Sequence, residues 1–314
     1  MNSIYPWQQA AWKHLAQLLE QSKLPHAILL SGPHYCGLGR LGEQLQALLV
    51  CQQPDTGKPC GQCLSCRLLS AGNHPDAACL RVEDGSTEIR IHQVRNLIHQ
   101  ITLTPSISQR KVALIQPADA MNKSSANALL KTLEEPAGHS VLILLSNDPQ
   151  RLLPTIRSRC QQLPVPAPAN DQAGQWLKDN YPDQLQELLD EALNAAQGMP
   201  MLAVRYLESD LLSQRKQVAR DLQALVRQQE HALSTAQRWA DLPCNELWLW
   251  LSGWCGSLAR KQVVSGGNVA GIHLSATELL DLQKLALESW RLCDTPLRQD
   301  LLLTDWLLIW SGKH

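Results

Sequence analysis

The stretch His26-Ala27-Ile28-Leu29-Leu30-Ser31-Gly32-Pro33-His34-Tyr35-Cys36-Gly37-Leu38-Gly39 joins an apolar, strand-like run to a helical run. Gly32 and Gly37 match the glycines of the phosphate-binding loop G-x-x-x-x-G-K-[ST], whose Lys contacts phosphates and whose hydroxyl binds Mg²⁺. Leu38 stands in place of that Lys, and Gly39 stands in place of the Ser or Thr. The sequence therefore predicts the frame of a nucleotide-binding loop without its working groups, and we expect no ATP as a cofactor.

Apolar runs alternate with helical patterns through the first half of the chain. The apolar runs are 27–30, 77–82, 112–115 and 141–145, and helical patterns occupy 7–22, 38–50, 91–101 and 126–135. Alternation of this kind is typical of a mostly parallel sheet with right-handed crossovers. The expected fold class is α/β, with a parallel sheet of the phosphate-loop type.

The pattern changes after the last of these strands. A Pro-rich stretch, 163–168, suits a stiff linker. A small helical segment follows to about residue 208, with a break at 197–200, and the remainder is helical throughout. We expect three domains: an α/β domain over 1–166, a small helical domain over 167–208 and an all-helical domain over 209–314.

Composition and charge narrow the function classes. The 314-residue chain has 28 Lys and Arg against 29 Asp and Glu, and this balance does not mark a free-standing electrostatic DNA binder. Residues 1–166 hold 15 basic against 11 acidic side chains, so this half is the one to face phosphates, if either does. No apolar run approaches the ~18–20 residues of a membrane span, and the first residues lack a signal-peptide pattern. We expect a cytoplasmic protein that contacts no membrane.

Four cysteines form the pattern C-x8-C-x2-C-x2-C, namely Cys51, Cys60, Cys63 and Cys66. Four thiolates on one short loop match a closed, tetrahedral zinc site of structural role. Their Gly, Gln, Lys and Ser neighbours argue against the alternative of ordinary core cysteines. In a cytosolic chain, cysteines indicate metal binding rather than disulfides. The others are predicted to be single, small hydrophobes: Cys36, Cys79, Cys160, Cys244, Cys255 and Cys293.

A second nucleotide motif is also altered. In ATP-hydrolysing proteins of this type, an apolar strand ends in acidic residues that hold Mg²⁺. After the apolar run 112–115, Gln116 and Pro117 occupy those places. Asp119 follows shortly after and is predicted to be a turn or helix-start residue. Two independent motifs have therefore lost their catalytic groups.

Two further segments carry a family resemblance. Residues 126–136, A-N-A-L-L-K-T-L-E-E-P, and residues 147–160, N-D-P-Q-R-L-L-P-T-I-R-S-R-C, resemble signatures of bacterial clamp-loader subunits of the AAA+ superfamily. With the four-cysteine spacing and the altered ATP motifs, the chain resembles the delta-prime type of DNA polymerase III clamp-loader subunit. Specific motifs cover residues 1 to about 208; beyond that, only helical character and length agree.

The resemblance implies a role and its partners. In that family, a delta-prime-type subunit is an ATPase-inactive stator that helps load a sliding clamp onto primed DNA. Its Ser-Arg-Cys motif, here centred on Arg159, offers an arginine finger to the ATP site of a neighbouring motor subunit. The implied partners are the ATPase motor subunits, the clamp-opening delta subunit and, through the complex, the clamp and primer-template DNA. The two helical domains correspond to a lid and a subunit-assembling collar.

Further expectations concern the helical domains. Met201 stands where motor subunits carry an Arg that senses the γ-phosphate. The C-terminal tryptophans are predicted to lie in a core or a subunit interface: Trp248, Trp250, Trp254, Trp290, Trp306 and Trp310. No catalytic site is expected in this chain itself, although the implied assembly is a DNA-directed DNA polymerase. Two alternatives remain open, an ATP-hydrolysing motor subunit and a zinc-containing nucleic-acid-binding regulator.

Overall fold

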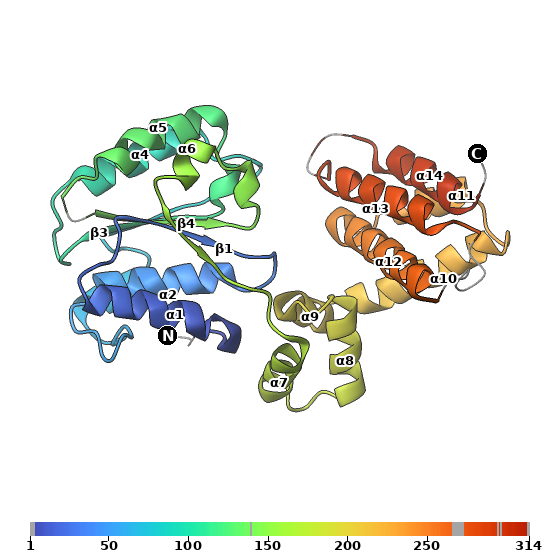
Figure 1. Ribbon diagram of the computed structural model, residues 1–314, viewed down its shortest axis with the longest axis horizontal. Coiled ribbons are helices and arrows are strands. Elements are labelled where there is room, and N and C mark those ends of the chain that lie inside the picture. The colour runs from blue at the N-terminus through green and yellow to red at the C-terminus, as the bar shows by residue number, and fades with distance from the viewer. Residues whose placement is uncertain (1–3, 139, 266–272, 294, 296, 313–314) are drawn as a thin grey trace. The chain divides into compact units, whose positions relative to one another are not determined.

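A computed structural model describes residues 4–138, 140–265, 273–293, 295 and 297–312 (Figure 1). The chain divides into two compact units. The first comprises Met1–Leu189 with Gly198–Leu202, and the second comprises Asp190–Gln197 with Ala203–His314. The predicted domain bounds at residues 166 and 208 stay a prediction.

The first unit contains the predicted parallel sheet. Its strands are β1 (Ala27–Ser31), β2 (Ala77–Leu80), β3 (Lys111–Ile115), β4 (Ser140–Ser146) and β5 (Gln161–Pro164). The spatial order is β2-β3-β4-β1-β5, and every neighbouring pair is parallel. β1 lies between β4 and β5, where Leu29 is in register with Leu144 and Gln162. The predicted α/β class is thus confirmed.

One strand was not predicted. Residues 161–164, of which the last two were assigned to the linker 163–168, form the edge strand β5. The prediction was wrong there because Gln161 and Gln162 are polar and exposed, so the segment lacks the apolar signal of a buried strand. Its pairing comes from backbone hydrogen bonds to β1 instead.

Helices cover both faces of this sheet (Figure 1). α1 (Gln9–Glu20) and α2 (Leu38–Val50) pack on one face, and α4 (Ile91–Thr102), α5 (Lys123–Glu134) and α6 (Pro154–Arg157) pack on the other. The shorter elements are α3 (Leu64–Ser70) and the 3-10 turns η1 (Pro6–Gln8), η2 (Ala118–Ala120) and η3 (Pro149–Arg151), and α7 (Asn170–Asn180) follows the sheet.

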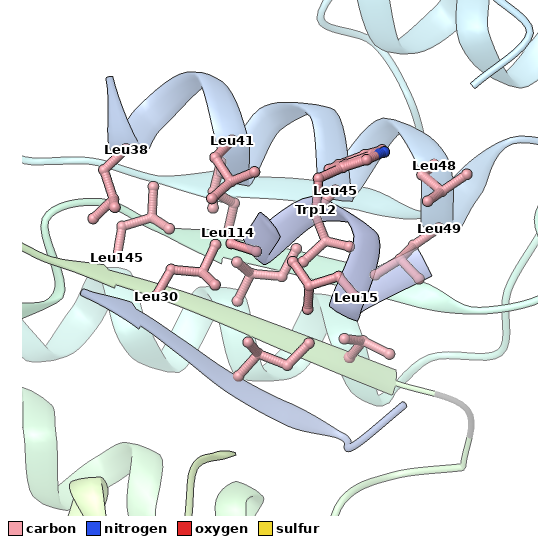
Figure 2. Close-up of a cluster of buried hydrophobic side chains, with 14 of the residues drawn as sticks. Trp12, Leu15, Leu30, Leu38, Leu41, Leu45, Leu48, Leu49, Leu114 and Leu145 are labelled. Carbon is pink, nitrogen blue, oxygen red and sulfur yellow. The ribbon is translucent and has the colours of Figure 1, made fainter. Parts of the chain in front are cut away.

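α2 shows why the core forms. Its leucines recur at helical spacing, so one apolar face is directed at the sheet. Figure 2 shows that face against the strands and α1, with Trp12, Leu15, Leu30, Leu38, Leu41, Leu45, Leu48, Leu49, Leu114 and Leu145 in one buried cluster. The bounds of α2 match the predicted helix 38–50.

The remaining helices are α8 (Gln186–Ala195), α9 (Pro200–Leu207), α10 (Leu211–Val226), α11 (Ala232–Trp239), α12 (Cys244–Ser265), α13 (Ala276–Trp290) and α14 (Gln299–Trp310). In the second unit, α12 packs along α13, and α11 packs against α14. Trp248, Trp250, Trp306 and Trp310 are buried, as in a core, whereas Trp254 and Trp290 are half-buried. The predicted alternative of a subunit interface stays a prediction. Among the described residues, no helix has the length and apolarity to span a bilayer.

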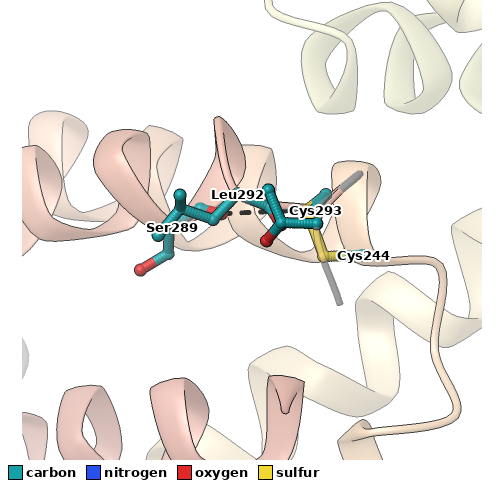
Figure 3. Close-up of a disulfide and its surroundings, with 5 residues drawn as sticks. Cys244, Ser289, Leu292 and Cys293 are labelled. Carbon is teal, nitrogen blue, oxygen red and sulfur yellow. Dashed lines mark hydrogen bonds between the residues drawn. A yellow bond between two sulfur atoms is a disulfide. The ribbon is translucent and has the colours of Figure 1, made fainter. Parts of the chain in front are cut away.

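The second unit also contains a disulfide between Cys244, at the start of α12, and Cys293, after α13 (Figure 3). The prediction that these two cysteines are single was wrong. They are 49 residues apart in sequence, and the packing of α12 on α13 brings their Cα atoms to 5.7 Å. Of the other predicted hydrophobic cysteines, Cys79 is exposed on β2, whereas the rest are buried: Cys36, Cys160 and Cys255.

Candidate functional site

The altered phosphate loop connects β1 to α2. The Leu38 side chain is 6% exposed and belongs to the core cluster, close to Leu145 (Figure 2). A β-carbon on Gly39 would lie 2.6 Å from Nε2 of Gln116. A Ser or Thr at position 39 would therefore require the amide of Gln116 to move. Gln116 of the second motif thus lies against Gly39 of the first, and the lack of a side chain at position 39 leaves room for the Gln116 amide.

A small cavity remains beside the loop, with a volume of about 220 Å³. It is lined by Tyr35, Gly37, Leu38, Gly39, Gln116, Pro117, Leu145, Asn147 and Met201. None of these lining residues is charged. Met201, predicted to replace a phosphate-sensing Arg, lies here, and its backbone N–H donates to the Tyr35 carbonyl at 3.3 Å. The lining therefore supplies no cation to a nucleotide phosphate.

His34 and Asp119, two further polar residues near the loop, also provide no cation for a nucleotide phosphate. Burial lowers the pKa of His34, although the carboxylates of Asp119 and Asp148 act in the opposite direction, so the imidazole favours its neutral form. Asp119 lies in the 3-10 turn η2, as predicted for a turn residue, rather than at the end of β3.

Side chains from elsewhere hold the loop through its carbonyls. Trp7 Nε1 donates to the Cys36 carbonyl at 2.8 Å, and Gln8 Nε2 donates to the Gly37 carbonyl at 2.8 Å. Asn147 Nδ2 donates to the Gly32 carbonyl at 2.9 Å. These three contacts were not predictable from the sequence, because they join positions far apart in the chain. Asn147 alone carried a signal, since it is a polar residue directly after an apolar strand and begins the signature 147–160.

Arg159 lies between α6 and β5, at the edge of the sheet. Its guanidinium pairs with Oε1 of Glu134 at 2.5 Å and donates to the Thr155 carbonyl at 2.9 Å. The Arg159 side chain is 34% exposed, and that of Glu134 is 49% exposed. The next residue, Cys160, is buried in the core, and burial raises the pKa of its thiol to about 12. The buried Cys160 thus fixes the backbone beside the partly exposed guanidinium of Arg159.

The four predicted metal ligands are brought together. The Cys51 sulfur lies 3.6 Å from that of Cys60 and 4.0 Å from that of Cys63, and all four sulfurs, including Cys66, are within 4.8 Å of one another. A tetrahedral centre with metal–sulfur bonds near ~2.3 Å separates its sulfurs by about 3.8 Å. The cluster can therefore hold a metal ion.

Backbone amides point at three of the four sulfurs. The N–H groups of Cys60, Cys63 and Cys66 each point at the sulfur of the preceding cysteine in the set, at 3.3–3.4 Å. Burial by itself raises the pKa of Cys63, but the amides of Cys66 and Gln52 outweigh it and lower the pKa to about 6. Burial and the neighbouring Cys63 raise the pKa of Cys66. Thiolate is the form that binds metal, so Cys63 is prepared for ligation.

The parallel sheet, its helical extension and the phosphate-loop frame define an AAA+-type protein. A family model described as DNA polymerase III, delta subunit, matches residues 7–169. DNA polymerase III subunit delta' of Pseudomonas aeruginosa is 42% identical over 84% of this chain and 79% of the relative. The subunit delta' of Yersinia pestis is 32% identical over 98% of this chain and 95% of the relative. The chain belongs to the delta' family of DNA polymerase III subunits.

A solved structure supports the fold. A DNA polymerase III, gamma subunit-related protein from Thermotoga maritima superposes with a TM-score of 0.53, covering 96% of this chain and 99% of that chain. Its sequence is 18% identical to this one, so the similarity concerns the fold alone.

Proposed function

We propose that this chain is an ATPase-inactive stator of a DNA polymerase III clamp loader. The observation that carries the proposal is the contact between Gln116 and Gly39. A hydrolytic site needs a Lys on the phosphates, a hydroxyl on Mg²⁺ and a carboxylate at the end of the adjacent strand. Leu38 is buried, Gly39 has no side chain, and the amide of Gln116 occupies the space between the two motifs.

The active contribution of the chain is Arg159. A guanidinium supplied across a subunit boundary offsets the charge that develops on a transferred phosphoryl group, an effect worth roughly 10³–10⁵ in rate. Two features suit Arg159 to this role. It is partly exposed at the sheet edge, and its partner Glu134 is a half-exposed carboxylate. An ion pair of this exposure is worth about 0–1 kcal/mol, so a phosphate can replace it at little cost.

The second unit supplies the assembly surface of this proposal. Leu280 and Leu287 are separated by two helical turns on α13 and are 52% and 40% exposed. Leu301 and Leu308 repeat that spacing on α14, at 55% and 37% exposed. Exposed apolar rows of this kind fit helices of other subunits. The partners are the motor subunits and the delta subunit, with the sliding clamp and primer-template DNA engaged through the cytoplasmic complex.

The metal of the proposal is Zn²⁺, held by Cys51, Cys60, Cys63 and Cys66. Zinc prefers four thiolates in a tetrahedron, and the sulfur separations suit that geometry. With all positions closed, the ion would fix the loop between α2 and α3 and would take no part in chemistry.

The test is the steady-state ATPase of a reconstituted loader that contains Arg159→Ala in this subunit. The clamp- and DNA-stimulated rate should fall, while assembly and the thermal stability of the isolated chain change little. The fall should be smaller than that of a single finger, because other sites keep their own. Arg151→Ala is the matched control, since Arg151 is exposed and lies on η3 nearby. Equal rates in all three loaders, with assembly verified, would leave this subunit a purely structural part.

A further inference from the structure

A buried polar cluster lies behind the cysteine loop, on the side of the sheet. Ser65 and His74 are 0% and 6% exposed. The Ser65 hydroxyl donates to the Val50 carbonyl at 2.6 Å and is hydrogen-bonded to Nε2 of His74. The Ser108 hydroxyl also donates to the Val50 carbonyl, at 2.9 Å, and lies 3.3 Å from Nε2 of His74. Two hydroxyls from separate segments thus donate to one backbone carbonyl, and the His74 ring contacts both hydroxyls.

The directions of these hydrogen bonds are fixed by the backbone. The N–H of Asp76 donates to Nδ1 of His74 at 2.9 Å, so the neutral ring carries its proton on Nε2. Nε2–H can then donate to Ser65, whose own proton goes to the Val50 carbonyl. Because the hydroxyl proton is used in this way, the arrangement does not activate Ser65 as a nucleophile. These hydrogen bonds fix the positions of the side chains, and each polar group in the cluster has a partner.

A second layer anchors the cluster to the sheet. The Asp76 carboxylate accepts the backbone N–H groups of Ser106, Ile107 and Ser108, each at 2.7 Å. It also pairs with Nζ of Lys111, the first residue of β3, at 3.1 Å. Both side chains are buried, with 0% exposure for Asp76 and 7% for Lys111. The segment that carries Ser108 is thereby fixed.

The positions of these contacts relate directly to the metal ligands. Val50 immediately precedes Cys51, and Ser65 immediately precedes Cys66. The cluster therefore fixes the backbone beside the first and the last cysteine of the set. We propose that Ser65, His74 and Ser108 are positioning residues that hold Cys51 and Cys66 in metal-binding geometry. This inference rests on the proposed metal site and adds residues that the four-cysteine pattern does not contain.

The physical reason lies in how little freedom a closed metal site allows. Groups that orient ligands without touching the metal change its affinity by roughly 10- to 100-fold when they are removed. Burying polar side chains reduces the stability of the fold unless each polar group forms a hydrogen bond. Apolar side chains would fill the same space without this cost. The cost is offset if the cluster holds two ligands at a defined separation.

The experiment measures metal binding in the full chain rather than any activity. Zinc release to a chromophoric chelator should be ~10-fold or more faster in His74→Ala than in the wild type. The visible absorption of the Co²⁺-substituted protein, which reports tetrahedral sulfur coordination, should shift or weaken in the same variant. His99→Ala is the matched control, because His99 is exposed on α4. Both readouts should be unchanged in this control.

Two further variants keep the inference testable. His74→Gln retains an amide that can donate to Ser65, so it should release zinc more slowly than His74→Ala. Should His74→Ala not fold, Ser108→Ala removes one bond to Val50 and should still speed release, compared with the exposed Ser106→Ala.

The outcomes separate this inference from the metal proposal. Wild-type release and wild-type Co²⁺ spectra in His74→Ala and Ser108→Ala would overturn the positioning role. Equal release from His74→Ala and His74→Gln would overturn its hydrogen-bond basis. Absence of zinc from the wild-type chain, matching the ligand variant Cys63→Ser, would instead refute the metal site itself.

Discussion

Lowering the pH until Asp76 becomes protonated should reduce the stability of the α/β unit. Burial by itself raises the pKa of this carboxyl, but the amides of Ser108, Ser106 and Ile107 and the ammonium of Lys111 stabilise the carboxylate. Together they bring the pKa down from the ordinary value of 3.8 to about 2. Because the folded state holds the charged form better than the unfolded state does, Asp76 contributes stability that requires ionisation.

The size of the Asp76 contribution to stability follows from the difference between its pKa values in the unfolded and folded states. A difference between 3.8 and about 2 corresponds to about 2.5 kcal/mol of unfolding free energy. A lowered carboxyl pKa gives stability that is fully present above the unfolded value. It is lost as the pH falls from about 4 to about 2. The Asp76 side chain is 0% exposed, so solvent screening does not reduce this figure appreciably.

The assay compares urea unfolding of the wild type and Asp76→Asn across this pH range. Near neutral pH, the variant should be less stable by about 3–5 kcal/mol, because it leaves the buried Lys111 without its counter-charge. That difference should shrink by about 2.5 kcal/mol toward the acid end, where the wild type also loses its charge. Losses that are common to both proteins cancel in the comparison.

The exposed Asp84→Asn is the control and should follow the wild type at each pH. A wild-type minus Asp76→Asn difference that stays constant through the acid range would refute the reasoning. It would mean that the amide hydrogen bonds do not favour the charged carboxylate.

Two predictions address the remaining parts of the proposed function. Leu38→Lys with Gly39→Thr should not restore Mg·ATP binding and should lower stability, since Leu38 is buried and the amide of a neighbouring side chain fills the space at Gly39; micromolar binding by calorimetry would contradict this. Leu280→Asp with Leu287→Asp should leave the chain folded but reduce its incorporation into the loader on gel filtration, whereas the control Leu185→Asp, 75% exposed on the first unit, should assemble normally.

The sequence predicted much of the α/β unit because periodicity is a local property. Buried parallel strands such as β3 and β4 contain uninterrupted apolar runs, 112–115 and 141–145, and amphipathic α2 repeats leucine on one face. The four-cysteine pattern also lies within one short segment, 51–66, so its geometry could be anticipated from spacing alone. Arg159 was found only through the family resemblance, and its role remains a prediction.

Features that depend on distant contacts were not predictable in this way. The disulfide between Cys244 and Cys293 and the loop contacts of Trp7 and Gln8 join positions far apart in sequence. The boundary between α10, which ends at Val226, and α11, which begins at Ala232, was not predicted either. No Pro marks this boundary.

The hydrogen bonds of the altered loop fit the proposed role of a subunit that does not respond to nucleotide. In a working phosphate loop, ligand oxygens bind the backbone N–H groups and order the segment. Here Trp7, Gln8 and Asn147 hold the loop through its carbonyls. In the stator role that we propose, a loop held by its own chain would keep one conformation whatever the nucleotide concentration. Such constancy is what a fixed partner needs if it is to present Arg159 to a neighbour at an unvarying position.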